Sequence, residues 1–305
     1  MKALVGVEDY GGFSSAANAL DTVQSNISTH VSKLESELDV ILVDRRSGAL
    51  TIEGAVVAAR VRLILREMES IQSDLFALKN DVRGSVRMGM IGTTARWLIP
   101  LLVPELTRRH PNLHFEVSEG TTTSLEARLH NGTVDLALVN KPSYSEEFAF
   151  KSLFDEEYVL FLKEAHPLAS KHSATIADLE GIELIVPPKG IPFRDLLDTL
   201  ARRSNIEFKV IAEVDGVRLI ASMAFDGFAP AIIPATAVPH YLSDFAVLPL
   251  VDLPNRRIGV ARRRRALESA PMLSVLTVLD EIFSGENYDA FPMPNGTRKI
   301  GEYKP

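Results

Sequence analysis

The sequence predicts an α/β protein in which a small helical head and one long helix precede a two-lobed α/β domain. Three observations predict this order. Two short helical patterns flank a tight break near the start, an apolar repeat of three and four residues follows, and strand and helix patterns then alternate to near the end. At roughly 100–200 residues per domain, a chain of 305 residues suits two or three folding units.

The composition is that of an ordinary water-soluble protein, with 46% hydrophobic and 24% charged residues. The chain contains no cysteine, which excludes disulfides, thiolate metal sites and any thiol-based redox switch. Glu8 and Asp9 interrupt the first apolar residues too early for a signal peptide, and no apolar run approaches the ~20 residues that span a bilayer. We therefore expect a cytoplasmic protein with no membrane partner.

Charge alone does not indicate a nucleic-acid partner. The net charge is −7, and the first 62 residues carry six lysines and arginines against eight aspartates and glutamates. Any argument for DNA binding must therefore depend on the pattern of residues.

Residues 13–20 predict a short helix with Ser14 as its N-cap, and residues 21–23 end it. A second helix is predicted from Gln24 or Ser25 to Leu38, because apolar residues recur there at spacings of four, three and four. The other face of that helix is small and polar. Two short helices joined by a tight turn are typical of a helix-turn-helix, although two helices of an ordinary all-α core fit the same pattern.

The residues after the second helix favour the DNA-binding interpretation. Two short apolar runs, 40–43 and 49–51, flank a polar segment and predict a two-stranded wing. Arg45 and Arg46 lie at its tip, where we expect them to meet backbone phosphates.

The residues of this region resemble the DNA-binding signature of the LysR-type transcriptional regulators. The matching positions are Leu4, Val7, Phe13, Ser14, Ala16, Ala17, Leu20, Gln24, Ser25, Ile27, Ser28, His30, Val31, Leu34, Glu35, Leu38, Arg45, Leu50, Thr51 and Gly54. The chain begins several residues late relative to the family pattern, so a shortened first helix is expected. The resemblance implies a winged helix-turn-helix over residues 1–52 that binds double-stranded promoter DNA. The expected DNA-binding residues are Ser14, Gln24, Ser25, Asn26, Ser28, Thr29, His30, Lys33, Arg45 and Arg46.

A long helix is predicted to follow, because residues 53–84 contain a heptad pattern and no proline. Apolar residues alternate at spacings of four and three in the order Val57, Val61, Ile64, Met68, Ile71, Leu75, Leu78 and Val82. The pattern predicts a coiled-coil seam between two copies of the chain, with a hinge at residues 80–85. The alternative is one amphipathic helix packed on its own domain, which usually has a wider apolar stripe. The family resemblance implies a homodimer, and further a dimer of dimers.

Strands and helices alternate from residue 85 to residue 284, which predicts an α/β domain with a largely parallel sheet. Strands are expected at 86–92, 113–118, 134–139, 183–186, 208–213, 229–233 and 257–261. Helices are expected at 96–109, 125–130, 193–204 and 217–225. The boundaries place lobe I at 85–162 and 266–284 and lobe II at 163–265. The polar tail 285–305 is expected to be disordered.

Several pieces of this region resemble the two-lobed, periplasmic-binding-protein-like (type 2) effector domain of LysR-type regulators. They include His110-Pro111-x-Leu113, Leu129-x-x-Gly132-x-x-Asp135-Leu136-Ala137, His166-Pro167-Leu168-Ala169 and the segment 226–234. The resemblance implies a small-molecule effector bound between the lobes.

The candidate effector residues follow from where strands end, since ligands of open α/β sheets bind near the carboxyl ends of strands and the N-termini of helices. Thr93 and Thr94 follow one expected strand, and Thr121, Thr122 and Thr123 follow another. Phe193 and Arg194 begin a helix of lobe II. Hydroxyls, free N–H groups and a cation suit a small organic anion, although the threonines also fit a role as N-caps.

Residue patterns of catalysis and of cofactor binding are missing from the sequence. It has no glycine-rich phosphate loop and no Gly-x-Ser-x-Gly motif, and Pro111 separates His110 from His114. We expect no catalytic residue, no metal and no cofactor. The arginine run 262–265 is expected to end a strand at a solvated face or a subunit contact.

Two other functions fit parts of the chain, and each meets an objection. A transporter's solute-binding protein shares the two lobes but has no helix-turn-helix. An enzyme with a dimerisation arm lacks a catalytic constellation here.

Overall fold

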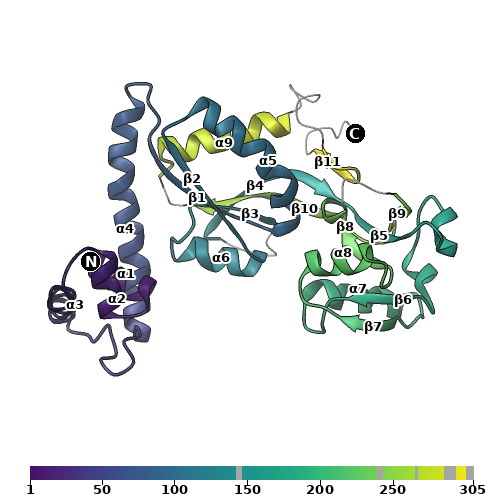
Figure 1. Ribbon diagram of the computed structural model, residues 1–305, viewed down its shortest axis with the longest axis horizontal. Coiled ribbons are helices and arrows are strands. Elements are labelled where there is room, and N and C mark those ends of the chain that lie inside the picture. The colour runs from purple at the N-terminus through teal and green to yellow at the C-terminus, as the bar shows by residue number, and fades with distance from the viewer. Residues whose placement is uncertain (142–145, 239–242, 265–266, 285–292, 300–305) are drawn as a thin grey trace.

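The computed structural model describes residues 1–141, 146–238, 243–264, 267–284 and 293–299. Figure 1 shows a helical head at one end of a long helix, α4, with the two α/β lobes following on one side of that helix. Within the described residues, no helix is both long and apolar enough to cross a membrane.

Three helices form the head, α1 (Lys2–Tyr10), α2 (Phe13–Ala19) and α3 (Gln24–Leu38). Their apolar faces share one core, in which Leu4, Val7, Ile27 and Val31 are almost fully buried. The helix-turn-helix is therefore present where the periodicity predicted it. The first helix is present too, with nine residues.

The predicted two-stranded wing is present in a minimal form, with backbone hydrogen bonds from Asp44 to Ala49 at 2.9 Å and from Thr51 to Leu42 at 3.0 Å. Only one antiparallel bridge, between Val43 and Leu50, joins the two segments among the described residues. The side chain of Glu35 accepts hydrogen bonds from the backbone N–H groups of Leu42 and Val43, at 2.9 and 3.2 Å. Those donors are therefore engaged by a side chain and cannot extend a ladder.

Helix α4 (Ile52–Ala77) begins at Thr51, whose hydroxyl accepts the N–H of Gly54 at 2.9 Å and caps the helix. Gly54 is required by a close approach, because a Cβ there would lie 1.9 Å from the carbonyl oxygen of Leu42. The helix ends at Ala77 and not at Val82, since Asn80 takes a left-handed conformation with φ 58°.

Lobe I is built on a mixed six-stranded sheet with the order β11-β4-β10-β3-β1-β2. Its strands are β1 (Gly84–Met90), β2 (Leu113–Glu119), β3 (Leu136–Asn140), β4 (Phe148–Glu156), β10 (Arg256–Arg263) and β11 (Thr297–Lys299). Its helices are α5 (Gly92–Arg109), α6 (Thr122–His130) and α9 (Ala270–Ser284). Figure 1 shows α5 and α9 on one face of the sheet and α6 on the other. The carboxyl ends of the parallel strands β1 and β2 thus lead directly into α5 and α6.

Lobe II is built on a five-stranded sheet with the order β7-β6-β8-β5-β9. Its strands are β5 (Tyr158–Lys163), β6 (Glu183–Val186), β7 (Lys209–Glu213), β8 (Ala231–Pro234) and β9 (Phe245–Pro249). Its helices are α7 (Pro192–Arg203) and α8 (Val217–Phe225), with 3₁₀ turns η1 (Pro167–Ser170), η2 (Ile176–Leu179) and η3 (Ala235–Ala237). Leu184 and Val186 pack with α7, while Ile185 between them packs with α8. Since strand side chains alternate between faces, the two helices cover opposite faces of this sheet.

The structure corrects two predicted boundaries. Strand β5 pairs in the sheet of lobe II and β10 in that of lobe I, so lobe II begins near residue 158 and ends before residue 256. The tail 285–305 is not disordered throughout, because Thr297–Lys299 pairs with β4 as strand β11. Residues 285–292 and 300–305 lie outside the described part of the chain.

Candidate functional site

The outer face of α3 carries the predicted base-reading residues. Gln24, Ser25, Asn26, Thr29, His30 and Lys33 are exposed, and Ser28 is half-buried. Several of these side chains are held by hydrogen bonds within the head. Asn26 donates to the hydroxyl of Thr22 at 3.1 Å, and the Thr29 hydroxyl donates to the carbonyl of Ser25 at 2.8 Å. The face is therefore polar, ordered and open to a partner.

Ser14 has a different role from the predicted N-cap. Gly12 is the N-cap of α2, and the hydroxyl of Ser14 donates to the side-chain oxygen of Gln24 at 3.0 Å. This hydrogen bond joins the start of α2 to the start of α3. Both residues remain exposed beside the polar face of α3.

Arg45 is held within the head and does not extend from it as predicted. Its guanidinium donates to Glu35 at 2.6 Å, to Ser28 at 3.2 Å and to Ser32 at 3.0 Å. The same group lies 5.0 Å from the ring centre of Phe13. Arg45 therefore fixes the turn after α3 to α3 itself, a role for which contact with a phosphate is not needed.

Glu35 is the residue of the head that sequence reasoning missed. Burial opposes its ionisation, but the N–H groups of Leu42 and Val43 and the guanidinium of Arg45 lower the pKa of its carboxyl below the usual value. One carboxylate thus anchors both the segment after α3 and the arginine that follows it. Its place in the family signature was the only signal available in the sequence.

Arg46 is the arginine of this turn that remains available for DNA. Its side chain is exposed, and within the described residues it has no hydrogen-bond or ion-pair partner. Its backbone N–H is fixed by the side chain of Asp44 at 2.8 Å. The turn thus presents an arginine side chain that none of the described residues engages.

The heptad residues of α4 divide into two groups. Val61 is only 4% exposed, and Val57 packs against the core of the head, so these two belong to the chain's own interior. The other five form an open apolar stripe, with exposures of 45% for Ile64, 60% for Met68, 61% for Ile71, 59% for Leu75 and 83% for Leu78. We call these five residues the α4 seam. Val82 is half-buried and lies beyond the helix.

The predicted effector threonines lie at the N-termini of two helices that follow parallel strands. Thr93 and Thr94 are buried in the first turn of α5. Thr94 is 0% exposed, and its hydroxyl has no hydrogen-bond partner within the described residues. Thr121 caps α6 by accepting the N–H of Ser124 at 3.3 Å, whereas Thr122 is half-buried and Thr123 is exposed in the first turn of α6.

Two side chains join the lobes near these threonines. Glu119, the last residue of β2, is ion-paired with Arg218 in the first turn of α8. Arg96 of α5 donates to the carbonyl oxygen of Val238 at 2.8 Å. Gly92 leaves the space that the Glu119 carboxylate occupies, since a Cβ there would lie 2.2 Å from a carboxylate oxygen. The N-terminus of α5 therefore already faces one carboxylate and one guanidinium.

Phe193 and Arg194 do not reach this place as predicted. Phe193 stacks on Tyr158 with ring centres 4.3 Å apart and packs against the core of lobe II. Arg194 is 5% exposed and donates to Asp198, to Glu213 and to the carbonyl of Pro187, each at 2.8 to 2.9 Å. Its guanidinium is engaged within lobe II, so Arg218 is the cation of lobe II that lies beside the threonines.

The arginine run 262–265 has separate roles within lobe I. Arg262 pairs with Glu268 at 2.6 Å, and Arg263 is half-buried and donates to the carbonyl of Leu129 at 3.0 Å. Arg264 donates to the carbonyls of Glu146 and Phe148, while Arg265 lies outside the described residues. No cluster of three potential metal ligands occurs in the part of the chain that the structure describes.

Comparison with known proteins agrees with this architecture. Residues 1–55 match the model of the bacterial regulatory helix-turn-helix proteins of the LysR family, and residues 79–284 match that of the LysR substrate-binding domain. The chain is 29% identical over 303 residues to the probable hydrogen peroxide-inducible genes activator of Mycobacterium leprae, covering 94% of each protein. It is 27% identical over 268 residues to the dual regulator OxyR of Escherichia coli, covering 86% of this chain and 88% of OxyR.

The solved structure of a full-length OxyR variant from Pseudomonas aeruginosa is similar over the whole chain. The TM-score is 0.74 at 25% sequence identity, and the match covers 97% of this chain and 98% of that one. The helix-turn-helix match argues against a transporter's solute-binding protein, which would contain only the lobes. The chain belongs to the LysR family of DNA-binding transcriptional regulators, with an N-terminal DNA-binding head and a C-terminal effector-binding domain.

Proposed function

We propose that this regulator binds a small organic anion between lobes I and II, and that the anion alters how the head contacts promoter DNA. The observation that carries the proposal is the hydroxyl of Thr94, which is fully buried and has no hydrogen-bond partner within the described residues. A buried hydroxyl without a partner costs free energy, which a ligand oxygen would recover. The N-terminus of α5 adds free N–H groups and a partial positive charge, both of which favour an anion.

A ligand of this kind needs two arrangements of the lobes, and the ion pair between Glu119 and Arg218 provides them because it is either formed or replaced by the ligand. The pair joins the lobes beside the N-terminus of α5, so an effector carboxylate would compete with Glu119 for Arg218. A ligand shifts an equilibrium only by its different affinity for the two states. Replacing an interlobe contact by a ligand contact provides that difference, because it changes how the lobes are held together.

The effector is a metabolite and the trigger is not oxidation of a thiol. One of the relatives above is named as a hydrogen peroxide-inducible genes activator and another as OxyR. Oxidation of a thiol requires a cysteine, and this sequence contains none. Thiol chemistry is therefore not available to the chain. We further propose that the protein acts in the cytoplasm, needs no cofactor or metal and catalyses no reaction.

The head reads DNA through the exposed face of α3, in the major groove. The side chains of Ser25, Asn26 and Thr29 meet base edges, and Arg46 meets a phosphate. The α4 seam pairs two chains, and two such dimers assemble on the promoter. Paired heads at a fixed separation suit two half-sites on one face of the DNA.

The effector site is tested by calorimetry with metabolites of the pathway encoded beside the gene. Thr94→Val keeps the shape of the side chain and removes its hydroxyl. If the hydroxyl pairs with a charged group, affinity falls by about 1.5–3 kcal/mol, or about 10- to 150-fold. Thr107→Val is the matched control, because Thr107 is an exposed threonine of the same helix. Equal affinities for the wild type and Thr94→Val would place the effector elsewhere.

A further inference from the structure

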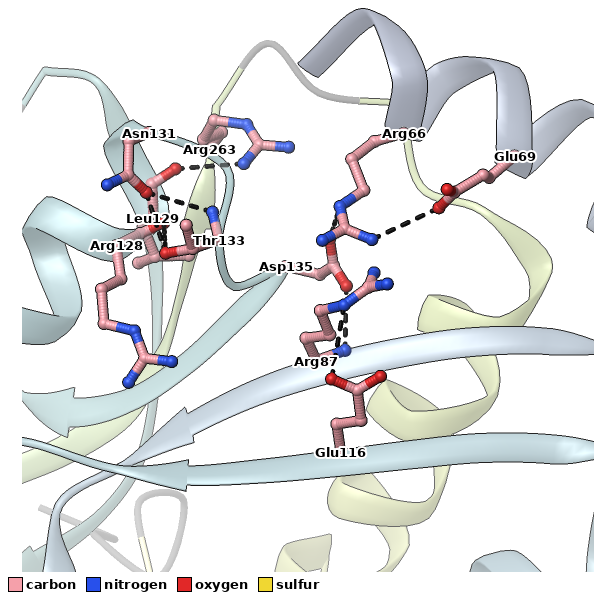
Figure 2. A network of polar contacts seen from close by, with 10 residues as sticks. All are labelled: Arg66, Glu69, Arg87, Glu116, Arg128, Leu129, Asn131, Thr133, Asp135 and Arg263. Atoms are coloured by element: carbon pink, nitrogen blue, oxygen red, sulfur yellow. Dashed lines mark hydrogen bonds and ion pairs between the residues drawn. The ribbon is translucent and has the colours of Figure 1, made fainter. Parts of the chain in front are cut away.

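A cavity of about 260 Å³ lies between α4 and lobe I, at the amino end of β1, whereas Thr93 and Thr94 follow the carboxyl end of that strand. Helix α4 lines it with Arg66, Ser70 and Ser73, and lobe I lines it with Arg87 and Arg263. We call this space the junction cavity. Figure 2 shows Arg66 and Arg87 at one aspartate, Asp135, and Arg263 nearby with its guanidinium toward Leu129.

Asp135 is the well-buried acid of this cluster. Its side chain is 13% exposed, whereas those of Glu69 and Glu116 are 61% and 47% exposed. One oxygen of Asp135 accepts the backbone N–H of Arg87 at 2.9 Å, and the other lies 3.9 Å from Nε of Arg66. Arg66 and Arg87 therefore contact one buried carboxylate, while Glu69 pairs with Arg66 and Glu116 with Arg87 from the solvent side. Glu67 is a further acid in the lining of the cavity.

The cluster has more hydrogen-bond donors than acceptors. Nε of Arg66 and Nη1 of Arg87 are buried and have no hydrogen-bond partner within the described residues. Burial lowers the pKa of the Arg263 guanidinium against the opposing effects of Asp135 and Glu67, and Arg66 lowers it further. Buried donors of charged groups are costly to leave unpaired. The hydroxyl of Ser70 adds a further potential donor at the wall of the cavity, whereas that of Ser73 donates to the carbonyl of Glu69 at 3.4 Å.

We propose that the junction cavity binds a small oxyanion of the phosphate class, either free phosphate or a small phosphate ester. Arginine matches the oxygens of such groups with paired N–H donors, and serine hydroxyls complete their coordination. The volume of about 260 Å³ lies just below the roughly 300–1,000 Å³ of ordinary small-molecule pockets, which suits a compact anion.

Binding there has a consequence for the whole molecule, because both α4 and lobe I supply donors. The anion binds most tightly when the helix is docked on the lobe, so it stabilises that arrangement. The docked arrangement is also held by Asp74 of α4, which accepts the N–H of Ala270 at the start of α9 at 2.8 Å. An anion at this site therefore strengthens the contact between α4, which carries the DNA-reading head, and lobe I of the effector domain. This effect is independent of the interlobe ligand.

The test is calorimetry of the full chain with inorganic phosphate, at an ionic strength held constant with chloride. Arg66→Gln removes one guanidinium, and affinity for phosphate is expected to fall about tenfold or more. Arg60→Gln is the matched control, because Arg60 is an exposed arginine of the same helix outside the junction cavity. It is expected to bind phosphate like the wild type. Ser70→Asp removes no arginine and adds a negative charge to the wall, and it is expected to weaken phosphate binding as well.

Two further variants separate this site from the others. Arg46→Ala removes an arginine of the head that has no partner within the described residues, and Thr94→Val alters the interlobe site; both are expected to leave phosphate affinity unchanged. Tighter binding of glycerol 3-phosphate than of phosphate would identify an ester as the natural occupant. Equal phosphate affinity in the wild type and Arg66→Gln, or no binding beyond that of chloride, would overturn the proposal. A loss confined to Thr94→Val would overturn it too, while supporting the interlobe site.

Discussion

Ile71→Asp tests whether the α4 seam pairs two chains. Ile71 is 61% exposed in the single chain, and full burial of an isoleucine side chain is worth about 1.5–3 kcal/mol. Covering its exposed part in both chains of a dimer contributes about 2–4 kcal/mol, which corresponds to a factor of about 30 to 1,000 in the dimer dissociation constant. Two aspartates in the seam add the cost of burying unpaired carboxylates, so the loss is larger than this range.

Light scattering and sedimentation at micromolar concentration measure the effect. The wild type is expected to be at least dimeric, and Ile71→Asp is expected to be monomeric. Val56→Asp is the matched control, since Val56 is also 61% exposed on α4 but lies outside the heptad seam. A monomeric wild type would refute the assignment, as would equal dissociation by both variants.

Three further predictions concern the head and the contact between α4 and lobe I. Arg46→Ala is expected to weaken binding to all DNA sequences alike and to lower the salt slope by about one in an anisotropy titration, whereas Arg45→Ala lowers the melting temperature of the head. The pKa of Glu35 is lowered in the folded protein, so its ionised carboxylate stabilises the fold above the usual pKa of 4.5, and this stabilisation is lost as the pH falls through the folded pKa. Melting curves from pH 7 to pH 3 should therefore show a smaller fall of the melting temperature at acid pH for Glu35→Gln than for the wild type. Asp74→Ala is expected to cost about 0.5–2 kcal/mol as a lost helix cap, with faster amide exchange at Ala270; unchanged exchange there would contradict a docked α4.

The head shows what periodicity can and cannot predict. The apolar spacing placed α3 correctly, because Ile27 and Val31 must face the core of the head together. The wing is shorter than predicted because Glu35, several residues earlier, accepts hydrogen bonds from the N–H groups of Leu42 and Val43. A hydrogen bond between a helix side chain and the backbone of a later segment produces no periodic pattern in the sequence.

Adjacent residues of one type can have opposite roles, and composition does not separate them. Arg45 is bound to Glu35 and two serines, whereas Arg46 remains free within the described residues. The heptad pattern of α4 has the same ambiguity. It runs through Val61, which is buried within the chain, into Ile71, which faces solvent, because an apolar period does not specify what covers it.

The sequence predicted where the lobe I residues of the candidate effector site lie, but it misplaced those of lobe II. The carboxyl ends of β1 and β2 are fixed by strand order, so Thr94 and Thr121 could be placed from the sequence. The partner from lobe II depends on how two lobes meet, which is set by contacts far apart in the chain. Arg194 is engaged by Asp198 and Glu213, and Arg218 lies at the interlobe contact instead.

Anisotropy with DNA from upstream of the protein's own gene tests the central claim most directly. Wild-type protein is expected to bind this DNA at least about 10³-fold more tightly than a scrambled duplex of equal length at physiological salt. Asn26→Ala is expected to reduce that ratio without changing the affinity for scrambled DNA, because Asn26 lies on the exposed face of α3. Equal affinity of the wild type for both duplexes, over several salt concentrations, would contradict the account of α3 as a sequence-reading helix.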